Sequence, residues 1–314
     1  MRVVVTGGAG FIGSHLSRRL AEKGNDVTII DDFRTGIIEN CAGLKVVEGD
    51  ICDSAVLNQA LRGAEVVYHM AAELGVERIV GRDEEVWRVE VEGTRNVLRA
   101  CVAHDVQRVL LASSSEVYGY YPKHRLPMAE GDNVVPDTLY GKAKRSGEIL
   151  GSRFLEKYGL HIIVVRYFNV YGPKQTRGGF VVPAFVHSLL SGQNIRIHGD
   201  GSQTRDFTFL DDAVDATIRV CRDEFNGQIF NIGSGRPTSM NELAHKLMGL
   251  SGTRSGIEYG PPRRPTDIHD KYADIAKIRK VVGWCPVTGL DEGLRLTVES
   301  YARTISDRGL AYSI

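Results

Sequence analysis

The stretch RVVVTGGAGFIGSHLSRRLAEKGNDVTIIDD, residues 2–32, decides the fold class. Residues 3–5 are a β-branched run too short for a helix, a glycine-rich turn follows, and an amphipathic segment then runs to Gly24. Residues 27–30 form a second apolar run, which is typical of a buried strand. The stretch therefore predicts a strand–helix–strand unit with its glycines at the first turn.

The glycines of this turn have the spacing that a bound pyrophosphate requires. Gly7 allows a tight turn, Gly10 allows close approach of a phosphate, and Gly13 allows contact between helix and strand. Phe11 and Ile12 open the helix, where backbone N–H groups can hold negative charge. The alternative is a glycine turn that binds nothing, and the acidic residues described next make it the weaker interpretation.

Acidic residues end the second strand at the distance that a dinucleotide site needs. A carboxylate at Asp31 or Asp32 accepts hydrogen bonds from a ribose 2′-hydroxyl and repels a 2′-phosphate, which favours NAD over NADP. Two further strand ends are expected to line the cofactor: Asp50 with Ile51 beside the adenine, and Ala71 with Ala72 where the backbone passes close to it.

Strands alternate with helices over the first half of the chain. A long helix is predicted over residues 83–104, and the strands after residue 32 are predicted at 44–50, 64–72, 106–112 and 161–173. This alternation predicts an α/β Rossmann fold, a doubly wound parallel sheet with ligands at the carboxyl ends of its strands.

The length of 314 residues allows one large domain or two smaller lobes. We expect residues 1–173 to form the NAD-binding Rossmann domain, with about 205–235 returning to it. Residues 174–314 are expected to form mainly a smaller α/β substrate-binding lobe.

Apolar residues make up 42% and charged residues 25% of the chain, which is typical of a soluble globular protein. Lys plus Arg and Asp plus Glu both total 39, so no net field attracts nucleic acid or an anionic membrane. The five cysteines are scattered without a C-x-x-C pair, so neither a disulfide framework nor a metal site is expected. The chain opens directly into a strand without an apolar signal region, and a reducing, cytoplasmic setting fits best.

A second stretch, VLLASSSEVYGYY at residues 109–121, ends a predicted strand in polar side chains, which need partners or water. Downstream, Tyr140 and Lys144 form the one Y-x-x-x-K of the chain and share one face of a helix. An ammonium beside a phenol favours the phenolate, so Tyr140 can act as a general base, and Lys144 can also hold the nicotinamide ribose. A serine hydroxyl at the strand end can hydrogen-bond the substrate oxygen that exchanges the proton.

The G-x-x-G-x-x-G spacing in TGGAGFIGSH resembles the extended, nucleotide-sugar-modifying branch of the short-chain dehydrogenases/reductases, the NAD-dependent epimerase/dehydratase family. In that family the strand after the long helix ends in a motif like S-[ST]-x-x-V-Y-G, and SSSEVYG at residues 113–119 is similar to it. The resemblance implies that Ser114 is catalytic together with Tyr140 and Lys144, and that Ser113 is structural.

Segments further along the chain resemble those that hold a nucleotide sugar, for which a UDP-sugar is expected. They are RYFNVYGP, GFVVPAFV, IRIHGDGSQTRDFTFLDD and RRPTD. Thr266 replaces the glycine of the family's R-x-G-D segment, in which Arg264 would bind the diphosphate. The resemblance implies these substrate-binding residues: Ser114, Ser115, Asn169, Val182, Arg196, Arg205, Arg264 and Asp267.

Enzymes of this branch share a first step, in which the tyrosinate takes the sugar 4-OH proton and hydride leaves C4 to give a 4-keto sugar. An epimerase then returns hydride to the other face, a dehydratase eliminates water with an Asp-Glu pair, and a decarboxylase loses CO₂. Glu116 occupies the position at which dehydratases and decarboxylases have their catalytic glutamate. Ser115 occupies the position of the dehydratase aspartate, and a serine is too weak an acid to protonate a leaving hydroxide.

The segment YGKAK is more similar to epimerases than to decarboxylases. The sequence therefore favours a nucleotide-sugar 4-epimerase narrowly. A decarboxylase that uses Glu116 comes second and a dehydratase third. A non-catalytic NAD-binding regulator comes last, because Ser114, Tyr140 and Lys144 are all present.

Related enzymes commonly dimerise through two helices, so a homodimer is expected through the helices at 83–104 and 140–158. Gly147 and Gly151 are expected to let a partner helix approach closely. The loop that follows the strand at 64–72 is expected to face the sugar through Glu73 or Arg78.

Overall fold

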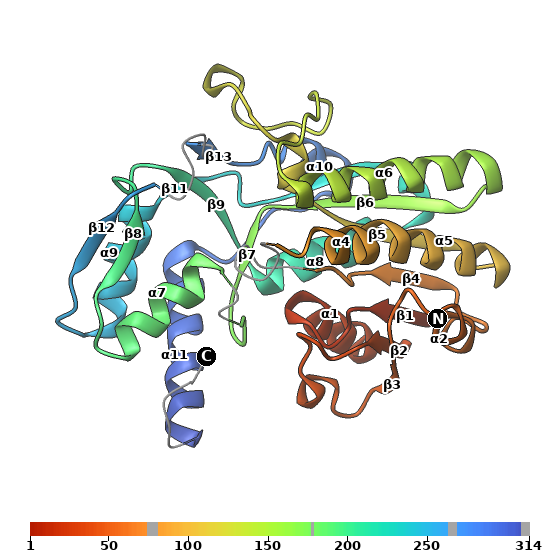
Figure 1. Ribbon diagram of the computed structural model, residues 1–314, viewed down its shortest axis with the longest axis horizontal. Helices are drawn as coiled ribbons and strands as arrows, with labels where there is room; N and C mark the ends of the chain where they lie inside the picture. Colours follow the sequence, from red (N-terminus) through yellow and green to blue (C-terminus); the bar gives the residue numbers. More distant parts are fainter. Residues whose placement is uncertain (74–80, 177–178, 263–268, 309–314) are drawn as a thin grey trace.

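The computed structural model describes residues 1–73, 81–176, 179–262 and 269–308 (Figure 1). Within these residues, seven parallel strands form one sheet in the spatial order β10-β6-β5-β4-β1-β2-β3. Its strands are β1 (Arg2–Thr6), β2 (Asp26–Asp31), β3 (Lys45–Glu48), β4 (Val66–His69), β5 (Arg108–Ser114), β6 (His161–Tyr167) and β10 (Ile229–Ile232). The strand order reverses between β1 and β4, so the predicted doubly wound Rossmann fold is confirmed.

Alternate residues of each strand build two separate apolar layers, because successive side chains point to opposite faces. Val3 and Val5 join one layer and Val4 joins the other. The first layer is covered by α1 (Phe11–Glu22), α8 (Leu210–Val220) and α10 (Ala276–Val282). The second is covered by α2 (Ser54–Ala60), α5 (Thr94–Ala103) and α6 (Leu139–Tyr158).

The long helix predicted over 83–104 is present, but its middle departs from α geometry. After α4 (Asp83–Trp87) the chain makes a π-helical segment, Arg88–Gly93, and then continues as α5. A π turn changes the direction in which the following side chains project, and such turns recur at functional sites. Glu90, in the middle of this segment, is 3% exposed.

The remaining elements form a smaller α/β lobe, drawn at the left of Figure 1. Its strands are β7 (Asn169–Tyr171), β8 (Ile195–His198), β9 (Thr204–Phe209), β11 (Pro237–Ser239), β12 (Ile257–Gly260) and β13 (Asp270–Lys271). Its helices are α7 (Val181–Leu190), α9 (Met240–Ser251) and α11 (Leu290–Arg308), which share an apolar core with β8 and β9. In the segment 205–235, β9 lies in this lobe, whereas α8 and β10 pack in the large one.

β13 pairs in parallel with β9 and brings Lys271 beside Arg205 in register. Among the residues described above, none of the helices combines the length and the hydropathy needed to cross a membrane.

Candidate active site

The residues predicted to touch a cofactor lie around the carboxyl ends of the parallel strands. They are Gly7, Gly10, Phe11, Ile12 and Gly13 after β1, Asp31 and Asp32 at the end of β2, Asp50 and Ile51 after β3, Ala71 and Ala72 after β4, and Tyr140 and Lys144 on α6. This is the edge of an α/β sheet at which ligands bind.

The turn between β1 and α1 leaves an uncovered helix N-terminus. Among the described residues, no side chain caps the first turn of α1, which follows Gly10. A Cβ at Gly13 would lie 2.1 Å from the Gly7 carbonyl oxygen, and a Cβ at Gly7 would lie 2.6 Å from the Ala71 backbone. The close packing and the free N–H groups fit the pyrophosphate of NAD.

Asp31 joins the end of β2 to the glycine turn. Its Oδ2 accepts the Ala9 N–H at 2.9 Å and its Oδ1 accepts the Phe33 N–H at 3.0 Å. Burial raises the pKa of this carboxyl above its usual value, and the two N–H groups oppose the shift. Each carboxylate oxygen has a second lone pair, so Asp31 can still accept a hydrogen bond from a ribose hydroxyl.

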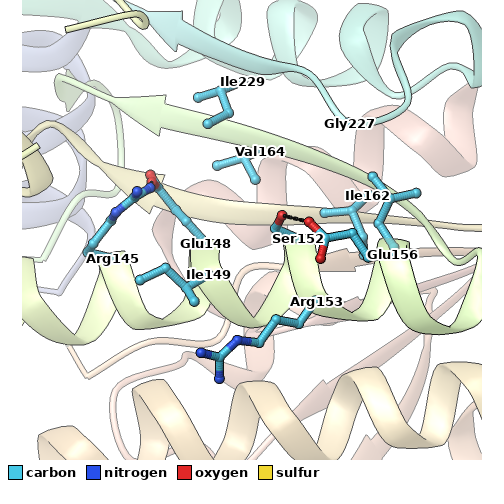
Figure 2. A pocket seen from close by; sticks show the side chains of 11 residues that line it. Arg145, Glu148, Ile149, Ser152, Arg153, Glu156, Ile162, Val164, Gly227 and Ile229 are labelled. Carbon is cyan, nitrogen blue, oxygen red and sulfur yellow. Dashed lines mark hydrogen bonds and ion pairs between the residues drawn. The ribbon is translucent and has the colours of Figure 1, made fainter. Parts of the chain in front are cut away.

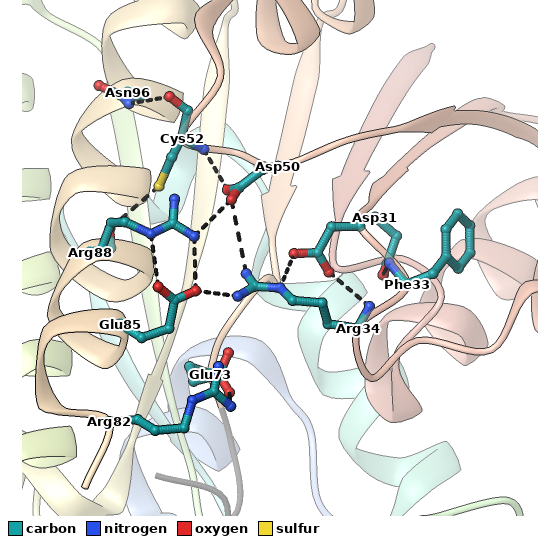
Figure 3. Close-up of polar contacts among 11 residues, drawn as sticks. Asp31, Phe33, Arg34, Asp50, Cys52, Glu73, Arg82, Glu85, Arg88 and Asn96 are labelled. Carbon is teal, nitrogen blue, oxygen red and sulfur yellow. Dashed lines mark hydrogen bonds and ion pairs between the residues drawn. The ribbon is translucent and has the colours of Figure 1, made fainter.

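A charged network ties the ends of β2 and β3 to α4 (Figure 3). Arg34 pairs with Asp32 at 2.5 Å and with Glu85. Arg88 pairs with Glu85 at 2.9 Å and with Asp50 at 2.8 Å. The hydrogen bond from Arg88, helped by Arg34, lowers the pKa of Glu85 to about 2. The network holds Asp50 at the position predicted for the adenine end of the cofactor.

Ser114, Tyr140 and Lys144 come together at the end of β5. Ser114 is the last residue of the strand, and its hydroxyl lies near enough to the Tyr140 phenol to favour the phenolate and lower its pKa. Lys144 Nζ lies 5.6 Å from the centroid of the Tyr140 ring and donates to the Ala112 carbonyl at 3.0 Å. The geometry fits a phenol that exchanges a proton with a substrate hydroxyl while a serine holds the same oxygen.

The protein groups around Tyr140 oppose its ionisation. Burial, then Glu90 and Glu116, raise the pKa of the phenol well above its usual range, and the hydrogen bond from Ser114 opposes the shift. A nicotinamide ring carries the positive charge that would reverse this balance. The carboxylates near Tyr140 therefore fit the positive charge of an oxidised nicotinamide ring.

Glu116 is paired with a buried lysine from the smaller lobe. Its Oε1 lies 2.6 Å from Lys271 Nζ, and the exposed fractions of the two side chains are 39% and 4%. Glu116 lies in the 3₁₀ turn Ser115–Tyr118 that follows β5, whereas Lys271 belongs to β13. The ion pair joins the turn after β5 to the smaller lobe.

Ser113 belongs to a buried structural network rather than to the catalytic group. Its hydroxyl donates to Glu148 at 2.6 Å. Glu148 also receives two hydrogen bonds from Arg166, each 2.8 Å long, and the two side chains are 2% and 1% exposed. The Arg166 guanidinium lies 4.9 Å from the centroid of the Tyr118 ring. This network fixes α6, and with it Tyr140, against β5 and β6.

The residues predicted for substrate binding fall in different places. Ser115 is buried beside Ser114, and Asn169 begins β7 just past the end of β6. Val182 is 2% exposed in the core of the smaller lobe, so its first-turn backbone is the part that a ligand can reach. Arg196 is exposed on β8, and Arg205 donates to the carbonyls of Thr204 and His269. Arg264, Asp267 and Arg78 lie outside the described residues.

Glu73, the other residue predicted to face the sugar, is 5% exposed and accepts a hydrogen bond from Arg82 at 3.1 Å.

The sequence-based prediction did not include Glu90, whose Oε2 lies 2.8 Å from Lys144 Nζ. A signal was available, because Glu90 falls at helical spacing between buried Val86 and Val97, inside an apolar stripe. It also missed Lys271, which the sequence around it does not distinguish from a surface lysine.

The two glycines predicted to admit a partner helix both lie on α6. A Cβ at Gly151 would lie 2.7 Å from Leu111 Cδ1, and a Cβ at Gly147 would lie 3.9 Å from Thr94 Cγ2. Gly151 is buried and lets α6 pack closely on β5, so the prediction is wrong for this glycine. A Cβ at Gly147 would make only an ordinary contact with α5, and the approach of a partner helix there stays a prediction. A cavity of about 460 Å³ lies between α6 and the strands β6 and β10, and Arg153 and Ile149 help to line it (Figure 2).

The fold and the Ser–Tyr–Lys group define a dinucleotide-dependent enzyme of the short-chain dehydrogenase/reductase class. Residues 3–233 match the family described as the NAD dependent epimerase/dehydratase family. The chain belongs to this family, and its cofactor is NAD.

Relatives within the family carry different activities. A UDP-glucose 4-epimerase of Mycolicibacterium smegmatis is 36% identical over 96% of this chain and 98% of its own. A UDP-N-acetyl-alpha-D-glucosaminuronate decarboxylase of Bacillus cytotoxicus is 34% identical over 98% of this chain and 99% of its own. The crystal structure of Thermotoga maritima UDP-glucose 4-epimerase with UDP-glucose has a TM-score of 0.93 and 34% identity, covering 97% of this chain and 100% of that one.

Proposed function

We propose that the chain is an NAD-dependent 4-epimerase of a nucleotide sugar, most simply a UDP-sugar. The observation that carries this proposal is the group formed by Ser114, Tyr140 and Lys144 at the end of β5. An epimerase needs little beyond these three residues. Relatives named as UDP-sugar 4-epimerases support the substrate class.

The proposed mechanism uses the chain's own residues to move one proton. The phenolate of Tyr140 takes the proton of the sugar 4-OH, and the ammonium of Lys144 stabilises the phenolate before the transfer. Ser114 donates a hydrogen bond to the oxygen as it becomes a ketone. NAD⁺ supplies the acceptor for the C4 hydride. The 4-keto sugar then turns its other face to the cofactor site, C4 recovers the hydride on that face, and Tyr140 returns the proton to the oxygen.

The pairing of Glu116 supports the epimerase over the dehydratase. Glu116 Oε1 lies 2.6 Å from Lys271 Nζ, so this carboxylate oxygen is already engaged by a lysine of the smaller lobe. Ser115 is too weak an acid to assist loss of hydroxide. The turn after β5 therefore lacks the acid–base pair that elimination across C5 and C6 needs.

A uronic-acid decarboxylase is the second candidate, because Lys271 offers a buried ammonium beside the site. If a uronate carboxylate displaced Glu116 from Lys271, the 4-keto acid could lose CO₂ there. A relative named as a decarboxylase is 34% identical to this chain.

The test of the proposed function is mass spectrometry of UDP-glucose, UDP-N-acetylglucosamine, UDP-glucuronate and their 4-epimers after incubation with the protein and NAD⁺. A new isomer of unchanged mass supports the epimerase, whereas loss of CO₂ or of water contradicts it.

Glu116→Gln separates the two candidates within the site. The amide keeps the shape and still accepts a hydrogen bond from Lys271, so an epimerase should retain kcat within about tenfold of wild type. Steady-state kinetics on the accepted sugar measures this. A loss of about a hundredfold or more would make Glu116 an acid or base of the reaction.

We propose a homodimer through α4, α5 and α6. These helices contact one another and expose three large hydrophobic side chains, Trp87 at 42%, Ile149 at 40% and Tyr158 at 48%. Trp87→Asp with Ile149→Asp should give a monomer in sedimentation velocity at micromolar concentration. The matched control is Val287→Asp, which replaces an 85% exposed side chain away from these helices. A wild-type monomer, or a dimer that survives the double substitution, contradicts the proposal.

A further inference from the structure

A carboxylate is buried against the catalytic lysine. Glu90 Oε2 lies 2.8 Å from Lys144 Nζ, and the exposed fractions of these side chains are 2% and 7%. Glu90 Oε1 accepts the Glu73 N–H at 3.0 Å. The proposed proton transfer gives this carboxylate no task, yet a buried ion pair has a high desolvation cost.

The groups that surround Glu90 come from several elements. Lys144 and Tyr140 face it from α6, His69 from β4, and Glu73 from the loop after β4. His69 contributes no charge, since burial and then Lys144 lower its pKa to about 3. Both its ring nitrogens hydrogen-bond hydroxyls, those of Thr6 and Thr94.

The Glu90 carboxylate neutralises Lys144. Burial raises the pKa of Glu90, whereas the ammonium and the Glu73 N–H favour its anion, and the short contacts to both donors fit a carboxylate. Lys144 alone would leave the site with a net positive charge before any cofactor binds. With Glu90 the pair is neutral, so the charge of the nicotinamide ring decides the local potential. NAD⁺ and NADH differ by one unit charge at that ring.

We propose that Glu90 is a positioning residue that makes the site select the oxidised cofactor, binding NAD⁺ in preference to NADH and allowing Tyr140 to ionise only beside NAD⁺. This inference rests on the proposed function, in which Tyr140 accepts the proton. It does not depend on which sugar is converted. An enzyme that must begin each cycle with NAD⁺ gains from this selection, because bound NADH without a keto sugar is a dead-end complex.

The test compares Glu90→Gln with wild type in binding NAD⁺ and NADH by calorimetry, without any sugar. The amide keeps the hydrogen bonds to Lys144 and Glu73 but removes one charge. We expect the ratio of the NADH Kd to the NAD⁺ Kd to fall by about tenfold, which corresponds to one unit charge at several ångströms in a partly screened site. Glu92→Gln, an exposed residue of the same π-helical segment, is the matched control and should leave the ratio unchanged.

A second pair of variants keeps the test decisive if Glu90→Gln does not fold. Glu90→Asp should keep the wild-type ratio and Glu90→Asn should lower it, although both shorten the side chain. A ratio that stays within twofold of wild type in the neutral variants would overturn the proposal, because Glu90 would then carry a proton and no charge.

The pH profile gives an independent readout. Glu90 disfavours the phenolate, so its removal lowers the Tyr140 pKa and should shift the acidic limb of kcat/KM to lower pH in Glu90→Gln. A limb that does not move contradicts the charge coupling. If no sugar is converted by wild type, the proposed function fails, while the cofactor binding ratio still decides the role of Glu90.

Discussion

Tyr140→Phe is expected to lower kcat by about 10²–10⁴-fold while NAD affinity stays within a few-fold of wild type. The substitution removes only the phenol oxygen of Tyr140, the group whose pKa Ser114 lowers. The ring and its contact with Lys144 remain, so the cofactor site keeps its shape. Steady-state kinetics on the accepted sugar and calorimetry with NAD⁺ measure the two effects separately.

The matched control is Tyr120→Phe, which removes a phenol oxygen from a side chain that is 75% exposed. It should leave kcat unchanged. A Tyr140→Phe protein that retains full activity on every sugar nucleotide would refute the catalytic group and revive the non-catalytic NAD-binding alternative.

Glu148→Leu is expected to cost about 3–5 kcal/mol of unfolding free energy at pH 7, because it leaves the Arg166 guanidinium buried without its carboxylate. The two side chains are 2% and 1% exposed, so water cannot replace the lost partner. The shift of the midpoint in urea denaturation measures this effect.

The double variant Glu148→Leu with Arg166→Met is the control, and it should recover most of the loss since neither charge remains. A single variant that unfolds at the wild-type urea concentration would contradict the structural role of the pair.

The pH dependence of this loss has a definite sign. Burial raises the pKa of Glu148, but Arg166, Ser113 and Arg145 outweigh it and hold the pKa below the usual value. A depressed pKa stabilises the fold above the unfolded value of about 4.3, and this contribution disappears as the pH falls through the folded value. The gap between wild type and Glu148→Leu should therefore be full at pH 7 and shrink in acid.

Short-range patterns were enough to predict the Rossmann fold. Glycine spacing, apolar runs and their alternation with helices are local properties, and the first 32 residues already contain a complete strand–helix–strand unit. The resemblance pointed to Ser114, and the structure brings it to Tyr140 and Lys144 because strand ends of a parallel sheet meet at one edge.

The partners of these residues depend on tertiary contacts that no spacing contains. Lys271 reaches Glu116 across 155 positions of sequence, through the pairing of β13 with β9 in the smaller lobe. Helical spacing places Glu90 inside an apolar stripe, but it does not say that the carboxylate meets Lys144, which lies on another helix. Gly151 was misplaced for a similar reason, because its spacing on the helix does not say which neighbour it approaches.

In the proposed reaction, hydride leaves C4 of a sugar nucleotide and returns to the same carbon from the other side. The most direct measurement follows the accepted UDP-sugar labelled with deuterium at C4, after incubation with the protein and NAD⁺, by mass spectrometry and NMR. For a 4-epimerase we expect the C4 epimer of the labelled sugar, with its mass unchanged and its deuterium still on C4. A product that has lost CO₂ or water, or an epimer whose deuterium has exchanged with solvent, would contradict it.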